Sequence, residues 1–266
     1  VCCLIWNSAE ALIFTIIAIA VLIPFFMFNK YPAKVFPGDV GTLSMGIMIA
    51  CIALFGSLEV VVFCVLLIHI FNSFYVLSSV RGFLESSEIQ KKNVDIILLN
   101  DDRIKASTKK NAALTLPRLI LAKGPLTEKE LVRNIYVISI ICGFFAVITS
   151  LLMVWTVKNF DLTIITIIII ILLAPTFFLL YKFDRIRGIV VLMIILLVGG
   201  TFFLLIIDMF IMMLPFEDIN LILLIIPLNL VFTFILLVPG LILWYYITIK
   251  YFWMQINKME KNNNKN

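Results

Sequence analysis

This chain contains a series of long apolar segments that carry almost no charge. Each segment has at least 18 residues, and six of the seven contain no Asp, Glu, Lys or Arg, while the exception contains only Asp208. A helix needs about 20 mostly apolar residues to cross a bilayer. The segments cover residues 11–28, 41–58, 60–80, 134–156, 162–181, 189–213 and 220–249. We therefore predict an all-α, polytopic helical membrane bundle with about seven transmembrane helices.

The composition excludes several other classes of protein. Hydrophobic residues make up 63% of the 266 residues, charged residues make up 14%, and the mean hydropathy is +1.14. A typical soluble domain is about 25% charged, because its surface must be solvated. A water-soluble enzyme, a disordered chain and a nucleic-acid-binding domain are therefore excluded.

The distribution of basic residues predicts the orientation of the chain. Residues 81–133 form a long polar loop with 11 Lys and Arg and 7 Asp and Glu. If this loop is cytoplasmic, simple alternation makes 29–40, 182–188 and 250–266 cytoplasmic too, and these four regions hold 20 of the 21 Lys and Arg. Loops rich in Lys and Arg stay in the cytoplasm. We predict a multi-pass integral membrane protein, which in a prokaryotic or archaeal source lies in the cell membrane.

The long loop contains two local patterns. Asn100-Asp101-Asp102 predicts a turn, because Asn and Asp bond readily to their own backbone. An apolar spacing farther along the loop predicts a helix near the membrane surface; its residues are Leu114, Leu116, Leu119, Ile120 and Leu121.

The most informative polar stretch is residues 29–46, between the first two predicted spans. Two prolines, Pro32 and Pro37, oppose a helix in this loop. Glycines flank Asp39 at positions 38 and 41 and permit turns that other residues avoid. A helix is predicted to begin at about Thr42, with its N-terminus at the cytoplasmic face.

This arrangement suits an anionic ligand. A helix N-terminus offers unpaired N–H groups and the positive end of the helix dipole, both favourable for phosphate. A carboxylate beside it is a ligand that Mg²⁺ accepts together with substrate phosphates. Lys30 and Lys34 add positive charge. The residues alone leave two interpretations open, a metal–diphosphate site or a Gly/Pro turn with one solvated aspartate.

The motif in this loop resembles a known family signature. Pro32-Ala33-x-Val35-Phe36-x-Gly38-Asp39-x-Gly41-Thr42-x-x-x-Gly46 is similar to the PAxVFxGDxGSxxxG pattern of the polyprenyl-phosphate N-acetylhexosamine-1-phosphate transferases. These membrane enzymes move a sugar 1-phosphate from a UDP-sugar to a lipid phosphate and release UMP. The resemblance favours the metal–diphosphate interpretation.

The resemblance implies a role for each matching residue. Asp39 matches the family's catalytic, metal-coordinating aspartate, with Mg²⁺ or alternatively Mn²⁺ as the cofactor. Phe36 matches the aromatic residue that stacks on the uracil. Gly38, Gly41 and Thr42 match the positions that shape the nucleotide-side loop.

Two further segments resemble the dolichyl-phosphate GlcNAc-1-phosphotransferase branch, which starts N-glycan assembly. They are Phe71-Asn72-Ser-Phe-Tyr75, and the loop segment from Lys123-Gly124-Pro125 to Leu131. Asn72 then lines the substrate site, with a hydrogen bond between helices as the alternative. The bacterial peptidoglycan branch carries a His-rich motif, whereas this chain has one His, His69, inside a predicted span.

In the family the long loop supplies basic residues to the diphosphate and the sugar. The available cations are Arg81, Lys91, Lys92 and Arg103, of which the first three are the candidate substrate-binding residues. A solvated loop on the positively charged side explains them equally well. Asp101-Asp102 is interpreted as a solvated turn and not as the family's acidic pair.

The resemblance also predicts how the chain is divided. Residues 1–160 are the C-terminal part of the transferase membrane domain, 161–250 an added three-helix membrane extension, and 251–266 a disordered cytoplasmic tail. The family's paired acidic residues and its Asn/Asp-Gly motif precede the matched loop on spans that this sequence does not contain. The chain thus reads as truncated at its N-terminus, and on its own it is expected to be inactive.

The predicted function is transfer of N-acetylhexosamine 1-phosphate, taken to be GlcNAc 1-phosphate, as the first membrane step of glycan assembly. The expected partners are a UDP-N-acetylhexosamine, a polyprenyl or dolichyl phosphate, the lipid bilayer and a second copy in a homodimer, with no nucleic acid. The rival interpretation is a non-enzymatic polytopic membrane protein, such as a transporter segment with a broken helix. It predicts charges near the centres of several spans, and six of the seven have none.

Overall fold

A computed structural model describes residues 1–80, 94–109, 111–158, 162–195, 242–243 and 245–258. The chain divides into two compact units, which are described separately. Unit 1 consists of Val1–Phe74, Asn100–Arg103 and Leu126–Asp184, and unit 2 consists of Tyr75–Leu99, Ile104–Pro125 and Arg185–Asn266.

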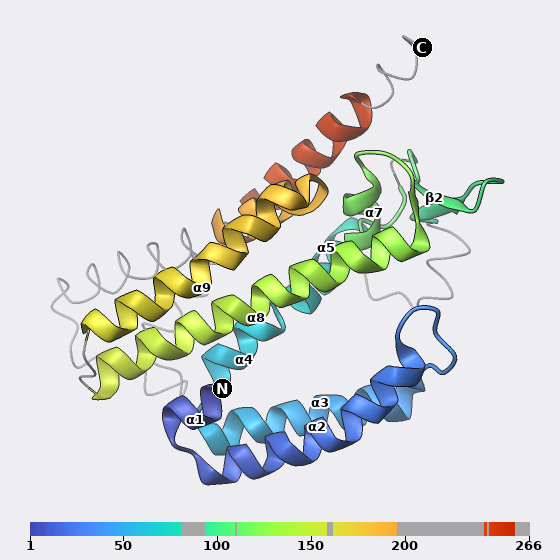
Figure 1. Ribbon diagram of the computed structural model, residues 1–266. Coiled ribbons are helices and arrows are strands. Elements are labelled where there is room, and N and C mark those ends of the chain that lie inside the picture. The colour runs from blue at the N-terminus through green and yellow to red at the C-terminus, as the bar shows by residue number, and fades with distance from the viewer. Residues whose placement is uncertain (81–93, 110, 159–161, 196–241, 244, 259–266) are drawn as a thin grey trace, which may run out of the picture. The chain divides into compact units, whose positions relative to one another are not determined.

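The described residues are mostly helical (Figure 1). The helices are α1 (Cys2–Trp6), α2 (Ala9–Asn29), α3 (Gly38–Gly56), α4 (Glu59–Val65), α5 (Leu67–Val80), α7 (Leu116–Leu121), α8 (Glu128–Lys158) and α9 (Leu162–Lys182). The strands are β1 (Ile96–Leu98), β2 (Arg103–Ala106) and β3 (Leu126–Thr127). Residues 184–195 and 245–258 are also helical.

Within the described residues, three helices are long and apolar enough to cross a membrane. They are α2, α3 and the part of α8 from Glu128 to Val154. The pair α4 and α5 makes a fourth if it forms one span, although the two helices are bent by 66° at Leu66. The predicted helical character and the presence of candidate membrane spans are therefore confirmed, whereas the all-α prediction omitted the short strands β1, β2 and β3. The count of seven stays a prediction, because residues 196–241 lie outside the described part of the chain.

The predicted helix start in the motif loop was wrong by four residues. We expected the helix to begin at about Thr42, but α3 begins at Gly38. The physical reason is that Pro37 acts as the N-cap residue: its carbonyl accepts a 3.1 Å hydrogen bond from the amide of Gly41, which closes the first turn. Asp39 consequently lies inside the first turn of the helix and not in the loop before it.

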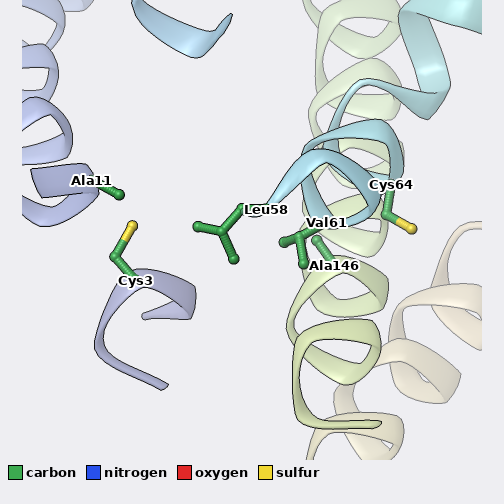
Figure 2. Close-up of a cluster of buried hydrophobic side chains, with 6 residues drawn as sticks. All are labelled: Cys3, Ala11, Leu58, Val61, Cys64 and Ala146. Carbon is green, nitrogen blue, oxygen red and sulfur yellow. The ribbon is translucent and has the colours of Figure 1, made fainter. Parts of the chain in front are cut away.

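Small side chains hold the helices of unit 1 together. Helix α2 packs against α3, and α8 packs against α1, α4 and α9. The buried cluster in Figure 2 brings residues of α1, α2, α4 and α8 around one leucine between α3 and α4; its members are Cys3, Ala11, Leu58, Val61, Cys64 and Ala146. Close approach of helices through small residues is typical of membrane bundles, where van der Waals packing drives association.

Unit 2 contains a short β-hairpin and α7. Strands β1 and β2 pair antiparallel, with Ile97 opposite Lys105. Thr115 caps α7 by accepting a hydrogen bond from the amide of Arg118. The helix is close to its predicted position. Its apolar residues are buried in the protein, however, and do not form an exposed face toward a membrane surface; they are Leu114, Leu116, Leu119, Ile120 and Leu121.

The helix over residues 245–258 packs within unit 2. The hydroxyls of Thr248 and Tyr75 lie 3.3 Å apart, and a Cβ atom added at Gly188 would lie 2.0 Å from the Tyr251 hydroxyl oxygen. Phe252 and Ile256 are buried. The prediction of a disordered tail from residue 251 is therefore wrong for residues 251–258, because their apolar side chains find a packing surface.

Candidate functional site

The candidate site is the N-terminal turn of α3. The amide of Gly41 is the first to bond within the helix, so the amides of Gly38, Asp39 and Val40 precede the hydrogen-bonded ladder. Such amides, together with the helix dipole, favour an anion. Asp39 is exposed in this first turn. The turn therefore combines anion-attracting amides with one carboxylate.

The structure explains why glycine occupies positions 38 and 41 of the motif. Gly38 has a φ of +58°, a conformation that costs residues with a side chain about 1–2 kcal/mol. A Cβ atom added at Gly41 would lie only 2.7 Å from the Cβ of Pro37. The sequence therefore needs glycine at both positions to form this helix start.

The hydroxyl of Thr42 bonds to the backbone of its own turn. It donates 3.0 Å hydrogen bonds to the carbonyl oxygens of Gly38 and Asp39. A threonine that bonds one turn back in this way shapes the local backbone. Thr42 thus contributes to the geometry of the turn and does not offer its hydroxyl proton to a ligand.

The loop before α3 is fixed at its base. The side-chain amide of Asn29 donates a 2.9 Å hydrogen bond to the carbonyl of Val35, and the amide of Lys34 donates a 2.8 Å bond to the carbonyl of Phe28. Phe36, the next residue, is 78% exposed. An exposed ring beside a helix N-terminus offers a face on which a planar base can stack.

The structure brings together five of the predicted site residues and not the others. Phe36, Gly38, Asp39, Gly41 and Thr42 lie in one segment of seven residues at the start of α3.

The remaining predicted site residues lie elsewhere. Asn72 is partly buried on α5 and has an interaction of its own there. The cations Arg81, Lys91 and Lys92 lie outside the described residues.

The described residues of this turn provide one protein ligand for a metal ion, the Asp39 carboxylate. No group of three or more His, Cys, Asp or Glu residues that could hold a metal ion occurs in the described part of the chain. Mg²⁺ is often bound by one or two carboxylates, with substrate phosphates and water completing the shell. The exposed Asp39 carboxylate fits that chemistry as one ligand.

The acidic pair at 101–102 forms a turn, as the sequence predicts. It joins β1 to β2, and Asp102 has a φ of 56°. The Arg103 side chain forms an ion pair with Asp101, and its Nε lies 2.6 Å from Oδ2. That hydrogen bond holds the pKa of Asp101 below its usual range. Asp101 is thus already neutralised by a neighbour within the turn.

Sequence reasoning missed Arg118. Its side chain is 2% exposed and donates hydrogen bonds to backbone carbonyls of the loop, while its guanidinium lies 4.6 Å from the ring centroid of Phe252. Burial lowers the pKa of Arg118 to about 10, and the nearby Asp95 carboxylate opposes this shift. One signal could have found it: Arg118 is the single charge in the apolar run 112–122.

Comparison with known proteins finds relatives that are named as transferases. The sequence model of glycosyl transferase family 4 matches residues 1–57, which contain the whole motif loop. A protein of Methanocaldococcus jannaschii named as a glycosyltransferase is 34% identical over 143 residues, 54% of this chain and 44% of the relative. No solved structure matches the chain.

Bacterial relatives match a shorter stretch. The phospho-N-acetylmuramoyl-pentapeptide-transferase of Streptococcus uberis is 38% identical over 77 residues, 29% of this chain and 23% of the relative. That of Bacillus subtilis is 32% identical over 82 residues, 30% of this chain and 25% of the relative. The chain therefore spans less than half the length of the curated relatives that it matches.

The family-model match covers the turn that carries Asp39, and the relatives are named as transferases of the kind that the motif predicts. Over residues 1–57 the chain is therefore similar to glycosyl transferase family 4, and its curated relatives are named as a glycosyltransferase and as phospho-N-acetylmuramoyl-pentapeptide-transferases.

Proposed function

We propose that this chain is part of an enzyme that transfers N-acetylhexosamine 1-phosphate, specifically GlcNAc 1-phosphate, from a UDP-sugar to a polyprenyl phosphate. The observation that carries the proposal is the exposed Asp39 carboxylate in the first turn of α3, beside three amides that precede the helical ladder. A diphosphate held by a metal ion needs this combination of an oxygen ligand and anion-attracting donors.

The reaction is a phosphoryl transfer. An oxygen of the lipid phosphate attacks the β-phosphorus of the UDP-sugar and forms a new P–O bond. The bond between the β-phosphorus and the bridging oxygen breaks, and that oxygen leaves with UMP. Positioning and electrostatic stabilisation supply most of the acceleration in such reactions.

Each described site residue has a task in this scheme. Asp39 holds the cofactor, Mg²⁺ or Mn²⁺, which when bound neutralises charge on the diphosphate. The ring of Phe36 stacks on the uracil. Gly38, Gly41 and Thr42 keep the amides of the turn directed toward the phosphates. Asn72, Arg81, Lys91 and Lys92 are proposed as further substrate contacts.

The lipid substrate reaches the site from the bilayer. Helices α2 and α3 expose many large apolar side chains, among them Phe26, Val40 and Leu43. The reacting phosphate is at the polar end of a long apolar chain, so a site at the end of an apolar helix pair suits it. The α2–α3 loop is where such a substrate meets a soluble nucleotide.

We favour the dolichyl-type branch over the bacterial peptidoglycan branch. The segments 71–75 and 123–131 resemble the dolichyl-type branch. The chain also has a single histidine. The lipid acceptor in this proposal is therefore dolichyl phosphate.

The proposal is tested with membranes that contain the complete gene product. Radiolabelled UDP-GlcNAc and dolichyl phosphate should give a labelled lipid diphosphate and UMP, and EDTA should abolish the product until Mg²⁺ is added back. UDP-GalNAc, and undecaprenyl phosphate as the acceptor, test the choice of sugar and lipid. No labelled lipid with any of these pairs would contradict the proposal and favour a non-enzymatic membrane protein.

A further inference from the structure

The side chain of Arg118 is buried, and backbone carbonyls of the long loop surround the edge of its guanidinium. Nε and Nη2 lie 3.1 and 2.8 Å from the carbonyl oxygen of Ser107, and Nη2 also lies 2.7 Å from that of Lys109. Nη1 lies 2.7 and 3.3 Å from the carbonyl oxygens of Ala112 and Ala113. These bonds use the five N–H donors of a guanidinium. The loop is therefore folded around one positive charge.

Two backbone amides of the loop report on this folded conformation. The amide of Ser107 donates a 2.9 Å hydrogen bond to the carbonyl of Asp95, and the amide of Leu114 donates a 2.9 Å bond to the hydroxyl of Ser79. A protected amide exchanges its hydrogen with solvent only when the local structure opens. The exchange rates of these two amides therefore measure how often the loop opens.

The flat face of the guanidinium is covered from the far end of the chain. The ring centroid of Phe252 lies 4.6 Å from Cζ of Arg118, and the two side chains are 1% and 2% exposed. A cation against an aromatic face is favourable, most of all when both are shielded from water. Water at this face would compete for the donors that hold the loop. The ring therefore protects the hydrogen bonds as well as contacting the charge.

The helix over residues 245–258, which carries Phe252, has one buried face. Thr248, Phe252 and Ile256 are spaced four residues apart and are each at most 1% exposed, so they lie along one side of the helix. The hydroxyl of Thr248 lies 3.3 Å from that of Tyr75 in α5. Because this face packs on α5 as well as on Arg118, the helix has a defined position within unit 2.

Residues 185–195 support the same arrangement within unit 2. The Arg185 side chain donates a 2.9 Å hydrogen bond to the carbonyl of Gly124, which follows α7. A Cβ atom added at Gly188 would lie 2.0 Å from the hydroxyl oxygen of Tyr251, so glycine is needed for this close contact. Two helical segments that follow residue 184 therefore contact the long loop or the helix that covers it.

We propose that the helix over residues 245–258 is a strap on the long loop: its Phe252 keeps water from Arg118, and the loop keeps its folded conformation only while the strap is in place. A hydrogen bond shielded from water is strong, whereas the same bond open to water adds little stability. The strap and the loop therefore open and close together. The strap is a property of the fold and does not depend on which sugar or lipid the protein binds.

The test is hydrogen exchange in the complete gene product, purified in detergent and followed by mass spectrometry of its peptides. Phe252→Leu keeps an apolar side chain but removes the aromatic face, so the amides of Ser107 and Leu114 should exchange at least about 10-fold faster. The matched control is Met254→Ala on the same helix: Met254 is 58% exposed, and its replacement should leave both rates unchanged. Equal rates in Phe252→Leu and the unaltered protein would overturn the proposal.

A second variant covers the case in which Phe252→Leu does not fold. Thr248→Val keeps the shape of the side chain and removes the hydroxyl beside Tyr75. It should speed exchange of the same two loop amides to a smaller extent, with α8 as protected as before. Unchanged loop exchange in Thr248→Val, or an equal loss of protection in α8, would overturn a strap that acts on the loop.

The reverse experiment tests whether the two parts open together. Arg118→Lys keeps the charge but loses the planar fork that reaches four carbonyls. Coupling between two sites is reciprocal, so this change in the loop should also speed exchange of the amides of residues 249–256 in the strap. Unchanged protection of the strap in Arg118→Lys would show that the two parts open independently, and the proposal would be wrong.

Discussion

The hydroxyl of Thr42 lies 3.0 Å from the backbone carbonyl oxygen of Asp39 and donates a hydrogen bond to it. The same hydroxyl is equally close to the carbonyl of Gly38. Both contacts are to the backbone, so the carboxylate of Asp39 stays exposed at the end of the helix. Thr42 therefore holds the turn, and the exposed Asp39 carboxylate is the group that the proposed function assigns to the metal ion.

The first prediction concerns the Asp39 carboxylate. In the complete gene product, Asp39→Asn keeps the size of the side chain but removes the charge that a divalent cation needs. Turnover should fall at least about 100-fold, as when one preorganised electrostatic group is removed from an active site. Labelled lipid product, measured at equal membrane expression, checks the prediction.

The matched controls for Asp39 are the aspartates of the β1–β2 turn. Asp101→Asn and Asp102→Asn should leave turnover within about 2-fold, because exposed substitutions away from a site rarely matter. Normal transfer in Asp39→Asn combined with loss of transfer in Asp101→Asn would show that the acidic site has been assigned to the wrong residue.

The second prediction concerns the glycines at the start of α3. Gly41→Ala places a Cβ 2.7 Å from that of Pro37, and Gly38→Ala forces a side chain into a backbone with φ of +58°. Either change should displace the first turn and reduce turnover about 10-fold or more, since misplacement by about 1 Å costs up to about 100-fold.

Gly143 in α8 provides the control for both glycines. A Cβ atom added there meets nothing within 4 Å, so Gly143→Ala should leave activity and thermal stability unchanged or slightly improved. Equal activity of Gly38→Ala, Gly41→Ala and Gly143→Ala would refute a role for this backbone geometry.

The third prediction concerns topology. Ser57 and Asn100 are both exposed, so cysteines at these positions are open to labelling. From the distribution of Lys and Arg, Asn100→Cys should react only from the cytoplasmic side and Ser57→Cys only from the opposite side. Positions 262 and 218, outside the described residues, should behave like 100 and 57 respectively.

The bent pair α4 and α5 makes this test decisive. A span that crosses the membrane places positions 57 and 100 on opposite faces, whereas a pair that turns back at the 66° bend places both on the same face. Labelling of both cysteines from one side would show that the chain does not cross the membrane between them. The predicted cytoplasmic placement of Asp39 would then be wrong as well.

The fourth prediction concerns the small-residue cluster of unit 1 (Figure 2). Leu58 is 2% exposed at the centre of that cluster. Leu58→Ala should lower the free energy of unfolding by about 2–5 kcal/mol, because the helices relax only partly into the space. The control is Leu54→Ala: Leu54 is 68% exposed, and its replacement should change stability by less than about 0.5 kcal/mol. Thermal unfolding in detergent compares the two, and equal losses would refute the packing described.

The apolar helices were predictable because their signal is local and long. Residues 162–181 were predicted as a helix and α9 covers Leu162–Lys182; residues 11–28 were predicted and α2 covers Ala9–Asn29. The site that the motif predicts around Asp39 stays a prediction. The start of α3 was missed, because proline and glycine were interpreted as loop signals although Pro37 and Gly38 begin the helix.

Features that depend on distant residues could not be predicted. The hairpin was expected only as a turn, because its strands have three and four residues and no clear alternation of polarity. The burial of Arg118 depends on the carbonyls of a folded loop and on Phe252 in another helix. No local pattern contains that information, and the helix over 251–258 was missed for the same reason.

The contact between Tyr75 and Thr248 joins residues that are 173 positions apart, and it has a consequence for synthesis. At about 5–20 residues per second, a ribosome takes on the order of 10–35 s to proceed from one codon to the other. Arg118 is made 43 residues after Tyr75, so while the last 130 residues up to Thr248 are added, its packing partners in residues 245–258 do not yet exist. The loop therefore completes its packing late in translation, and a nascent chain arrested before Thr248 carries the loop without those partners.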